Sequence, residues 1–201
     1  MKKLRRLFYR RPAIELAPDL IGKILVHRAG TKEYRARIVE TEAYIGEHDL
    51  ACHASKGRTN RTEVMFGRAG HAYVYFIYGM YDMLNVVASH AGDAQAVLIR
   101  AAEPLEGWKA DLSGPGKLAR AMKITRADNG VDLTGQKLFF LDDDWPRPKI
   151  SRSKRIGVDY SGHWKHALLR FFDAESSFVS KSPMLRGISL PRRSRRALAS
   201  K

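Results

Sequence analysis

The stretch that decides the fold of this chain is Ile38-Val39-Glu40-Thr41-Glu42-Ala43-Tyr44-Ile45-Gly46. Its β-branched and aromatic residues predict a β-strand. Because side chains alternate along a strand, the even-numbered residues from Ile38 to Tyr44 are expected to share one face. That face carries two carboxylates, Glu40 and Glu42, and a buried carboxylate is costly unless it has a partner or a function. The stretch therefore predicts a pocket wall; an exposed edge strand with solvated acids is the alternative.

The overall composition is that of an ordinary globular protein. The chain has 201 residues, 44% hydrophobic and 28% charged, enough for one domain with a sizeable core. No apolar run approaches the roughly 18 residues of a membrane helix, and no apolar segment follows the basic N-terminus as in a secretory signal. The single cysteine, Cys52, excludes an internal disulfide and suits a reducing cytoplasm, where we expect the protein to act.

The net charge of +15 is concentrated at the two ends of the chain. Residues 1–11 carry six Lys or Arg and residues 181–201 carry seven, with no acid in either segment. Between them, 23 basic residues face 21 acidic ones, so the body at 12–180 is nearly neutral. Basic ends attract polyanions, of which nucleic acid is the commonest in a cytoplasm; solubilising tails without a specific partner are the alternative. We expect a domain at 12–180 and a mobile C-terminal tail from residue 181.

The remaining sequence predicts many strands, few helices and one long loop. We expect strands at 24–27, 34–44, 72–77, 84–88, 96–102, 137–141, 155–158 and 168–172, and short helices at 18–21, opened by Pro18, and at 118–122. Residues 46–71 show little apolar periodicity, and loops of that length are more often functional than idle. The predicted fold class is α+β: a single domain with a curved, mixed or antiparallel sheet, surrounding short helices and a protruding β-hairpin.

The predicted hairpin places a large aromatic side chain at its tip. Its strands flank the turn Tyr78-Gly79-Met80-Tyr81. An aromatic at such a tip, on a basic protein, is well placed to wedge between DNA bases. A tyrosine folded back onto its own sheet is the alternative for Tyr78.

Taken together, the motifs resemble one known family. They are VETEAYIG (39–46), Ala51-Cys52-His53, YVYFIYGMY (73–81) with Asn85, VLIRAAEPLEG (97–107), GPGKLARAM (114–122), Arg155-Ile156-Gly157-Val158 and Leu169-Arg170-Phe171-Phe172. In this order, across roughly residues 12 to 180, they resemble the alkyladenine DNA glycosylases, also called 3-methyladenine or N-methylpurine DNA glycosylases. The resemblance implies an enzyme that binds double-stranded DNA, flips a damaged purine out of the helix and hydrolyses its N-glycosidic bond.

The resemblance also implies catalytic roles for three residues. Glu42 matches the general base that activates a water against C1′ of the flipped nucleotide, a role that suits a carboxylate beside an oxocarbenium-like centre. Arg100 matches the residue that helps to hold Glu42 and the water; an ion pair between Arg100 and Glu103 is the alternative. The backbone carbonyl of Val158 matches the group that holds the water. Asp159 follows Val158 at a position where relatives often have glycine, so the turn after Val158 differs from theirs.

The same resemblance implies a base pocket. Tyr44, His53 and Tyr75 match the residues that enclose the everted base, and Asn85 matches a side chain that crowds the exocyclic amino group of guanine. Tyr78 matches the residue that intercalates in the gap left in the duplex. The implied substrates are 3-methyladenine, 7-methylguanine, hypoxanthine and 1,N6-ethenoadenine.

Other kinds of function are less well supported by the sequence. The spacing of His48, Cys52 and His53 fits no zinc pattern, and we expect no metal or other cofactor. The Gly-rich segment before Lys117 lacks the spacing of a nucleotide-binding loop and suggests at most a contact to DNA phosphate. No lysine occupies a matched pocket position, so we expect a monofunctional enzyme, and nothing requires more than a monomer. A non-catalytic protein that binds damaged DNA on the same scaffold is the alternative; it would have no use for Glu42 together with Arg100.

Overall fold

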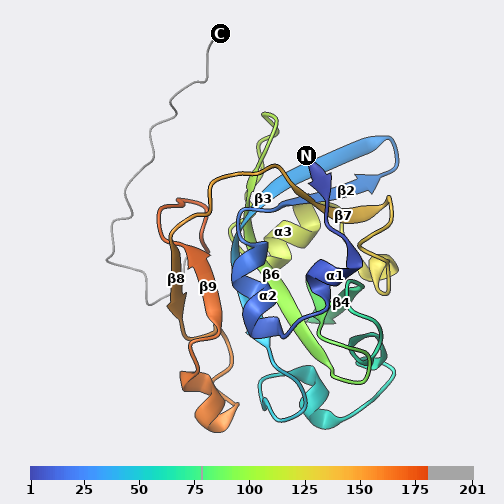
Figure 1. The fold of residues 1–201 in the computed structure, drawn as a ribbon, viewed down its shortest axis with the longest axis vertical. Coiled ribbons are helices and arrows are strands. Elements are labelled where there is room, and N and C mark those ends of the chain that lie inside the picture. The colour runs from blue at the N-terminus through green and yellow to red at the C-terminus, as the bar shows by residue number, and fades with distance from the viewer. Residues whose placement is uncertain (78, 181–201) are drawn as a thin grey trace.

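In the computed structural model, which describes residues 1–77 and 79–180, the long strand β3 (Lys32–Tyr44) is the centre of a nine-stranded sheet (Figure 1). One edge of β3 pairs with β6 (Gln95–Pro104). Its other edge pairs first with β2 (Ile24–Ala29) and then, over Glu40–Glu42, with β9 (Arg170–Asp173). Glu40 and Glu42 therefore lie in the interior of the sheet and are fully buried, which excludes the exposed edge strand as an alternative.

The predicted fold class is confirmed. The described strands pair antiparallel in the order β1-β7-β2-β3-β6-β5-β4, with β9 beside β3 and β8 beside β9. The remaining strands are β1 (Lys2–Lys3), β4 (Ala72–Ile77), β5 (Tyr81–Ala88), β7 (Leu138–Asp142) and β8 (Ile150–Ser153). The helices are short: α1 (Arg6–Tyr9), α2 (Ala13–Leu20) and α3 (Pro115–Ala121), with 3-10 turns η1 (His53–Lys56), η2 (Glu63–Phe66), η3 (Arg126–Asp128) and η4 (Gly162–His166). No described helix is long and apolar enough to cross a membrane.

A pair of β-bulges between β3 and β6 sets which side chains face the site. The register shifts between Ile38 and Glu40. It shifts again between Glu40 and Thr41, where Arg100 of β6 has no paired residue on β3. Ile38 therefore faces the main core, whereas Glu40 and Glu42 face the opposite side. The prediction that Ile38 shares their face was wrong, because an extra residue in one strand reverses the alternation beyond it.

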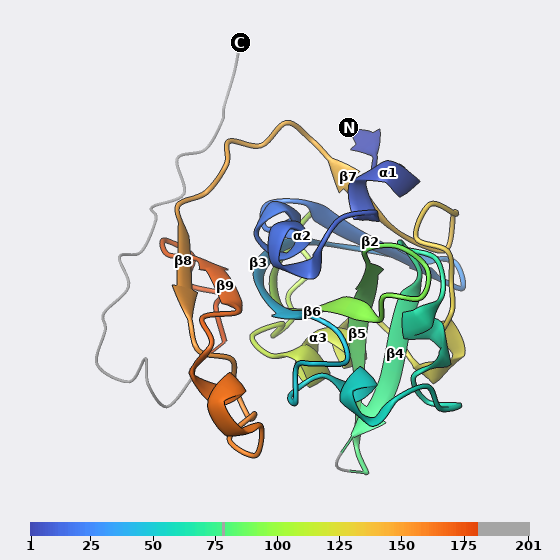
Figure 2. The same ribbon diagram turned by 60° about the horizontal axis from the view of Figure 1, so that its bottom comes forward.

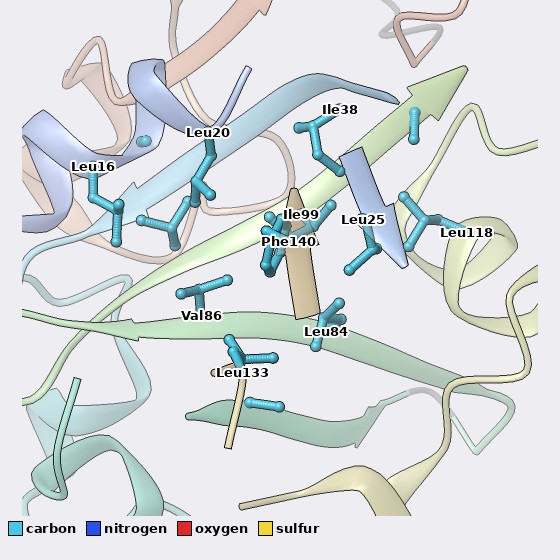
Figure 3. Close-up of a cluster of buried hydrophobic side chains, with 14 of the residues drawn as sticks. Leu16, Leu20, Leu25, Ile38, Leu84, Val86, Ile99, Leu118, Leu133 and Phe140 are labelled. Carbon is cyan, nitrogen blue, oxygen red and sulfur yellow. The ribbon is translucent and has the colours of Figure 1, made fainter. Parts of the chain in front are cut away.

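The main core lies on the other side of β3. Leu16 and Leu20 of α2 pack there with Ile38, Ile99 and Phe140, as Figure 3 shows. Each fully buried leucine stabilises the fold by about 1.5–3 kcal/mol. The helix spans Ala13–Leu20, so the prediction of a helix opened by Pro18 was wrong: Pro18 lies in the last turn. A proline there removes only one hydrogen bond of the helix, and Gly22, at φ +89°, follows the helix end.

The two ends of the described chain both pack on the sheet. Lys2–Lys3 pair with β7 and Tyr9 is fully buried, so the basic N-terminal segment packs on the domain. At the other end, Phe178 and Val179 pack against Val39, Ala101 and Phe172. The predicted tail from residue 181 lies outside the described residues.

The predicted hairpin is confirmed and projects from the body of the molecule (Figure 2). Its strands β4 and β5 pair from Ala72 opposite Val86 to Ile77 opposite Tyr81. Tyr78 lies outside the described residues, so its intercalating role stays a prediction. The predicted strand at 155–158 was wrong: this segment is irregular, and the pairing next to β9 comes from Ile150–Ser153 instead.

Candidate active site

A cavity of about 120 Å³ lies between the hairpin, the ends of β3 and β6, the loop after β3 and the segment 156–160. Six of the eight residues predicted from the sequence line it: Tyr44, His53, Tyr75, Asn85, Arg100 and Val158. Tyr73, Met83 and Tyr160 also contribute to its wall. Elements that are far apart in the sequence thus bring the predicted pocket residues together.

Glu42 lies directly behind the wall of this cavity. Its side chain is fully buried, and Oε2 accepts hydrogen bonds from the Tyr44 hydroxyl at 2.9 Å and from Arg100 Nη1 at 3.2 Å. Oε1 accepts the backbone N–H of Ile156 at 2.8 Å. All three partners line the cavity. A carboxylate offers about four acceptor positions, and these three bonds fix its orientation.

Arg100 connects the two buried carboxylates of β3. Its Nε donates to Glu40 Oε1 at 3.0 Å, while its Nη1 donates to Glu42. These ion pairs replace the alternative pairing with Glu103. Burial by itself lowers the pKa of Arg100, but the carboxylates of Glu42 and Glu40 together raise it above its usual range. The guanidinium is therefore charged at every pH at which the protein is folded, and it offers a fixed positive charge at the cavity.

The tyrosine at the end of β3 is held from two sides. Burial and then the charge of Glu42 raise the pKa of Tyr44 well above its usual value, so its hydroxyl stays protonated and donates to Glu42. The Arg155 guanidinium lies 4.8 Å from the centre of the Tyr44 ring. Arg155 is also paired with Asp49, and both side chains are fully buried. The role of this pair was missed from the sequence, where Asp49 stands in a polar loop without any pattern.

His53 contacts the two tyrosines of β4. Its Nδ1 lies 2.9 Å from the Tyr73 hydroxyl, and its ring meets Tyr75 edge to face, with centroids 4.5 Å apart. Burial, with the nearby charges of Arg61 and Lys56, lowers the pKa of His53 to about 4. The ring is therefore neutral near pH 7. Because Nδ1 is engaged by Tyr73, Nε2 is the ring nitrogen that can meet the edge of a bound base.

Asn85 is fixed by the backbone of its own hairpin. Its side-chain amide donates to the Tyr73 carbonyl at 3.1 Å and to the Met83 carbonyl at 3.4 Å. The side chain is buried at the cavity wall and cannot easily turn aside from a bound base. Such a rigid group can reject a substituent by collision.

The Val158 carbonyl is already occupied. It accepts the backbone N–H of Ser161 at 3.0 Å and the Ser161 hydroxyl at 2.6 Å. The role of the Val158 carbonyl in holding a water stays a prediction. Val158 lines the cavity, in the turn that follows Gly157. The N–H of Ile156, to which no sequence pattern pointed, is the backbone group that meets Glu42.

The Gly-rich segment at the start of α3 has a packing role. A Cβ on Gly116 would come within 2.6 Å of the Tyr81 ring, so glycine allows α3 to approach the hairpin. Lys117 is held by Asp111, with Nζ 2.8 Å from Oδ2. Within residues 1–77 and 79–180, no group of three or more His, Cys, Asp or Glu side chains could hold a metal ion.

Comparisons with known proteins identify the family of this chain. The family described as Methylpurine-DNA glycosylase (MPG) matches residues 7–177 of the chain. A relative from Legionella pneumophila (strain Corby) is 48% identical over 183 residues, covering 90% of this chain and all of that protein. Relatives from Methanocella arvoryzae and Myxococcus xanthus are each 50% identical, covering 90% and 91% of this chain and 97% and 96% of theirs. All three carry the name "Putative 3-methyladenine DNA glycosylase". The chain therefore belongs to the methylpurine-DNA glycosylase family and is a DNA N-glycosylase of DNA repair.

Proposed function

We propose that this enzyme excises alkylated and deaminated purines by hydrolysis, with Glu42 as the base that activates water. The observation that carries the proposal is the buried carboxylate of Glu42, held by Arg100, Tyr44 and Ile156 immediately behind an aromatic cavity. An everted purine between Tyr44 and Tyr75 would place its sugar towards Glu42. Stacking in the cavity would replace the stacking lost from the duplex.

The chemistry follows from the charges at the site. As the N-glycosidic bond breaks, its electron pair leaves with the base and positive charge develops on the sugar. The Glu42 carboxylate would stabilise that charge. It would also accept a proton from the attacking water as the oxygen of that water bonds to C1′. No lysine is among the described residues of the cavity wall, so an imine with the sugar is not expected. The product would be an abasic site.

The substrates we propose are 3-methyladenine, 7-methylguanine, hypoxanthine and 1,N6-ethenoadenine. The names of the relatives support the first of these. N-methylated purines already carry positive charge and leave readily, whereas neutral hypoxanthine depends more on the enzyme. The buried amide of Asn85 would collide with the exocyclic amino group of guanine. 7-Methylguanine carries the same group, so its excision would depend on the weakness of its cationic glycosidic bond. We also propose that the enzyme acts as a monomer.

A single-turnover assay tests this proposal. Duplexes that contain one of the four lesions are incubated with excess enzyme, and abasic sites are then revealed by alkaline strand cleavage. We expect cleavage at the lesion and none on the undamaged duplex. Absence of cleavage with all four lesions would overturn the proposal and favour the non-catalytic DNA-binding protein, for which the paired Glu42 and Arg100 have no use.

The basic C-terminal segment should contribute to DNA affinity. Replacing the seven Lys and Arg residues of 181–201 by Gln keeps the length of the chain but removes its positive charge. Since counterion release follows the number of neutralised phosphates, the slope of log K against log salt should become less negative by about 0.9 for each phosphate that the segment neutralises in the wild type. Fluorescence anisotropy on an undamaged duplex at several salt concentrations measures this slope, and an unchanged slope would show that the segment does not bind DNA.

A further inference from the structure

Glu40, the other buried carboxylate of β3, has no part in the proposed reaction, yet it accepts four hydrogen bonds from described residues. Glu40 is fully buried and does not line the cavity. Its Oε1 accepts from Arg100 Nε at 3.0 Å, Arg170 Nε at 2.6 Å and the Ser180 hydroxyl at 2.8 Å. Its Oε2 accepts the backbone N–H of Ser180 at 2.6 Å.

These bonds determine where Arg100 points. The guanidinium is a rigid plane, and one edge of it is held by Glu40 through Nε while Nη1 reaches Glu42. A planar group bound to two carboxylates cannot rotate without breaking one of the bonds. If Glu40 moved, Arg100 would lose its anchor, and Glu42 would keep only the bonds from Tyr44 and Ile156.

Ser180, at the C-terminal end of the described chain, binds Glu40 through its backbone N–H and its hydroxyl. Phe178 and Val179 pack into a small apolar cluster with Val39 and Phe172, which brings Ser180 over Glu40. Arg170 reaches both partners, since its Nε donates to Glu40 and its Nη2 lies 3.5 Å from the Ser180 carbonyl. The two carboxylates, Glu40 and Glu42, balance the two guanidiniums of Arg100 and Arg170, so the buried cluster is neutral overall.

We propose that Glu40 and Ser180 are positioning residues for excision: Ser180 fixes Glu40, Glu40 fixes Arg100, and Arg100 holds Glu42 and the water in the reactive geometry. The inference rests on the proposed function of Glu42. It assigns the segment Phe178–Ser180 a part in catalysis, although Ser180 does not touch the cavity. A misplacement of about 1 Å at a reacting group can cost a large factor in rate.

The test compares Ser180→Ala with Ser180→Thr in the full chain. The alanine variant loses the hydroxyl bond to Glu40 but keeps the backbone bond, and the threonine variant restores a hydroxyl. We expect the single-turnover rate constant for hypoxanthine excision, at saturating enzyme, to fall about fivefold to tenfold in Ser180→Ala. Ser180→Thr should recover most of the rate, and the Kd for the lesion duplex should change less than about twofold in both.

Glu40→Gln is the second variant and should lower the rate further, because it removes the negative charge that anchors Arg100. Thermal unfolding identifies any loss of folded protein, and rates are compared per folded molecule. A wild-type rate in both Ser180→Ala and Glu40→Gln would overturn the inference while leaving the proposed function intact. An equal loss in the alanine and threonine variants would also overturn it. If the wild-type enzyme excised none of the lesions, the proposed function itself would fail.

Discussion

Glu42→Gln is expected to lower the rate constant for excision of hypoxanthine by about 10³-fold, in the middle of the range for loss of a general base. The amide has nearly the shape of the carboxylate but can neither accept a proton from water nor balance positive charge on the sugar. At the same time, Arg100 keeps its bond to Glu40, so the cavity wall should remain in place. The loss is therefore expected in the chemical step.

The measurement is a single-turnover time course at saturating enzyme, together with the Kd for the same lesion duplex. The Kd should change less than about threefold, because stacking and shape are retained. Glu106→Gln is a matched control: it removes a carboxylate that is exposed and paired with Arg35. This control should excise at the wild-type rate. A Glu42→Gln variant that retained more than about a tenth of the wild-type rate would exclude Glu42 as the base.

Asp49→Ala is expected to lower the free energy of unfolding by about 3–5 kcal/mol, the cost of leaving one member of a buried ion pair without its partner. Arg155 Nη2 lies 2.8 Å from Asp49 Oδ1, and both side chains have no exposed surface. Without Asp49, the guanidinium keeps only the Ala43 carbonyl as a hydrogen-bond partner among the described residues. The ring of Tyr44, against which it packs, should loosen with it.

Urea unfolding followed by circular dichroism measures this loss. The double variant Asp49→Ala/Arg155→Met should recover part of it, because it removes the unpaired charge and keeps most of the buried volume. Glu63→Ala breaks the exposed pair with Arg58 and should leave the midpoint unchanged. A single Asp49→Ala variant that lost less than about 1 kcal/mol would show that the buried pair does not hold this part of the structure together.

Features that depend on local sequence could be predicted. The alternation and β-branched content of 34–44 and 72–88 indicated β3 and the hairpin, and the hairpin strands pair without a register shift. The family motifs placed Tyr44, His53, Tyr75 and Asn85 in one pocket, and the structure brings them together. These residues come from β3, β4 and β5 and from the long loop after β3.

Features that depend on irregular backbone could not be predicted. The bulges that turn Ile38 away from Glu40 leave no signal in a two-residue pattern, since one added residue reverses every later side chain. The backbone N–H of Ile156 meets Glu42 only because residues 155–158 are not a strand. The bond from Ser180 to Glu40 joins positions 140 residues apart, and no local sequence pattern at either position indicates it.

The most direct measurement is a crystal structure of Glu42→Gln bound to a duplex that contains one hypoxanthine. We expect the purine to be everted and stacked between Tyr44 and Tyr75, with C1′ of its sugar one water molecule away from the side chain at position 42. A purine that remained in the helix, or a sugar separated from that side chain by more than one water, would contradict the central claim that Glu42 activates the attacking water.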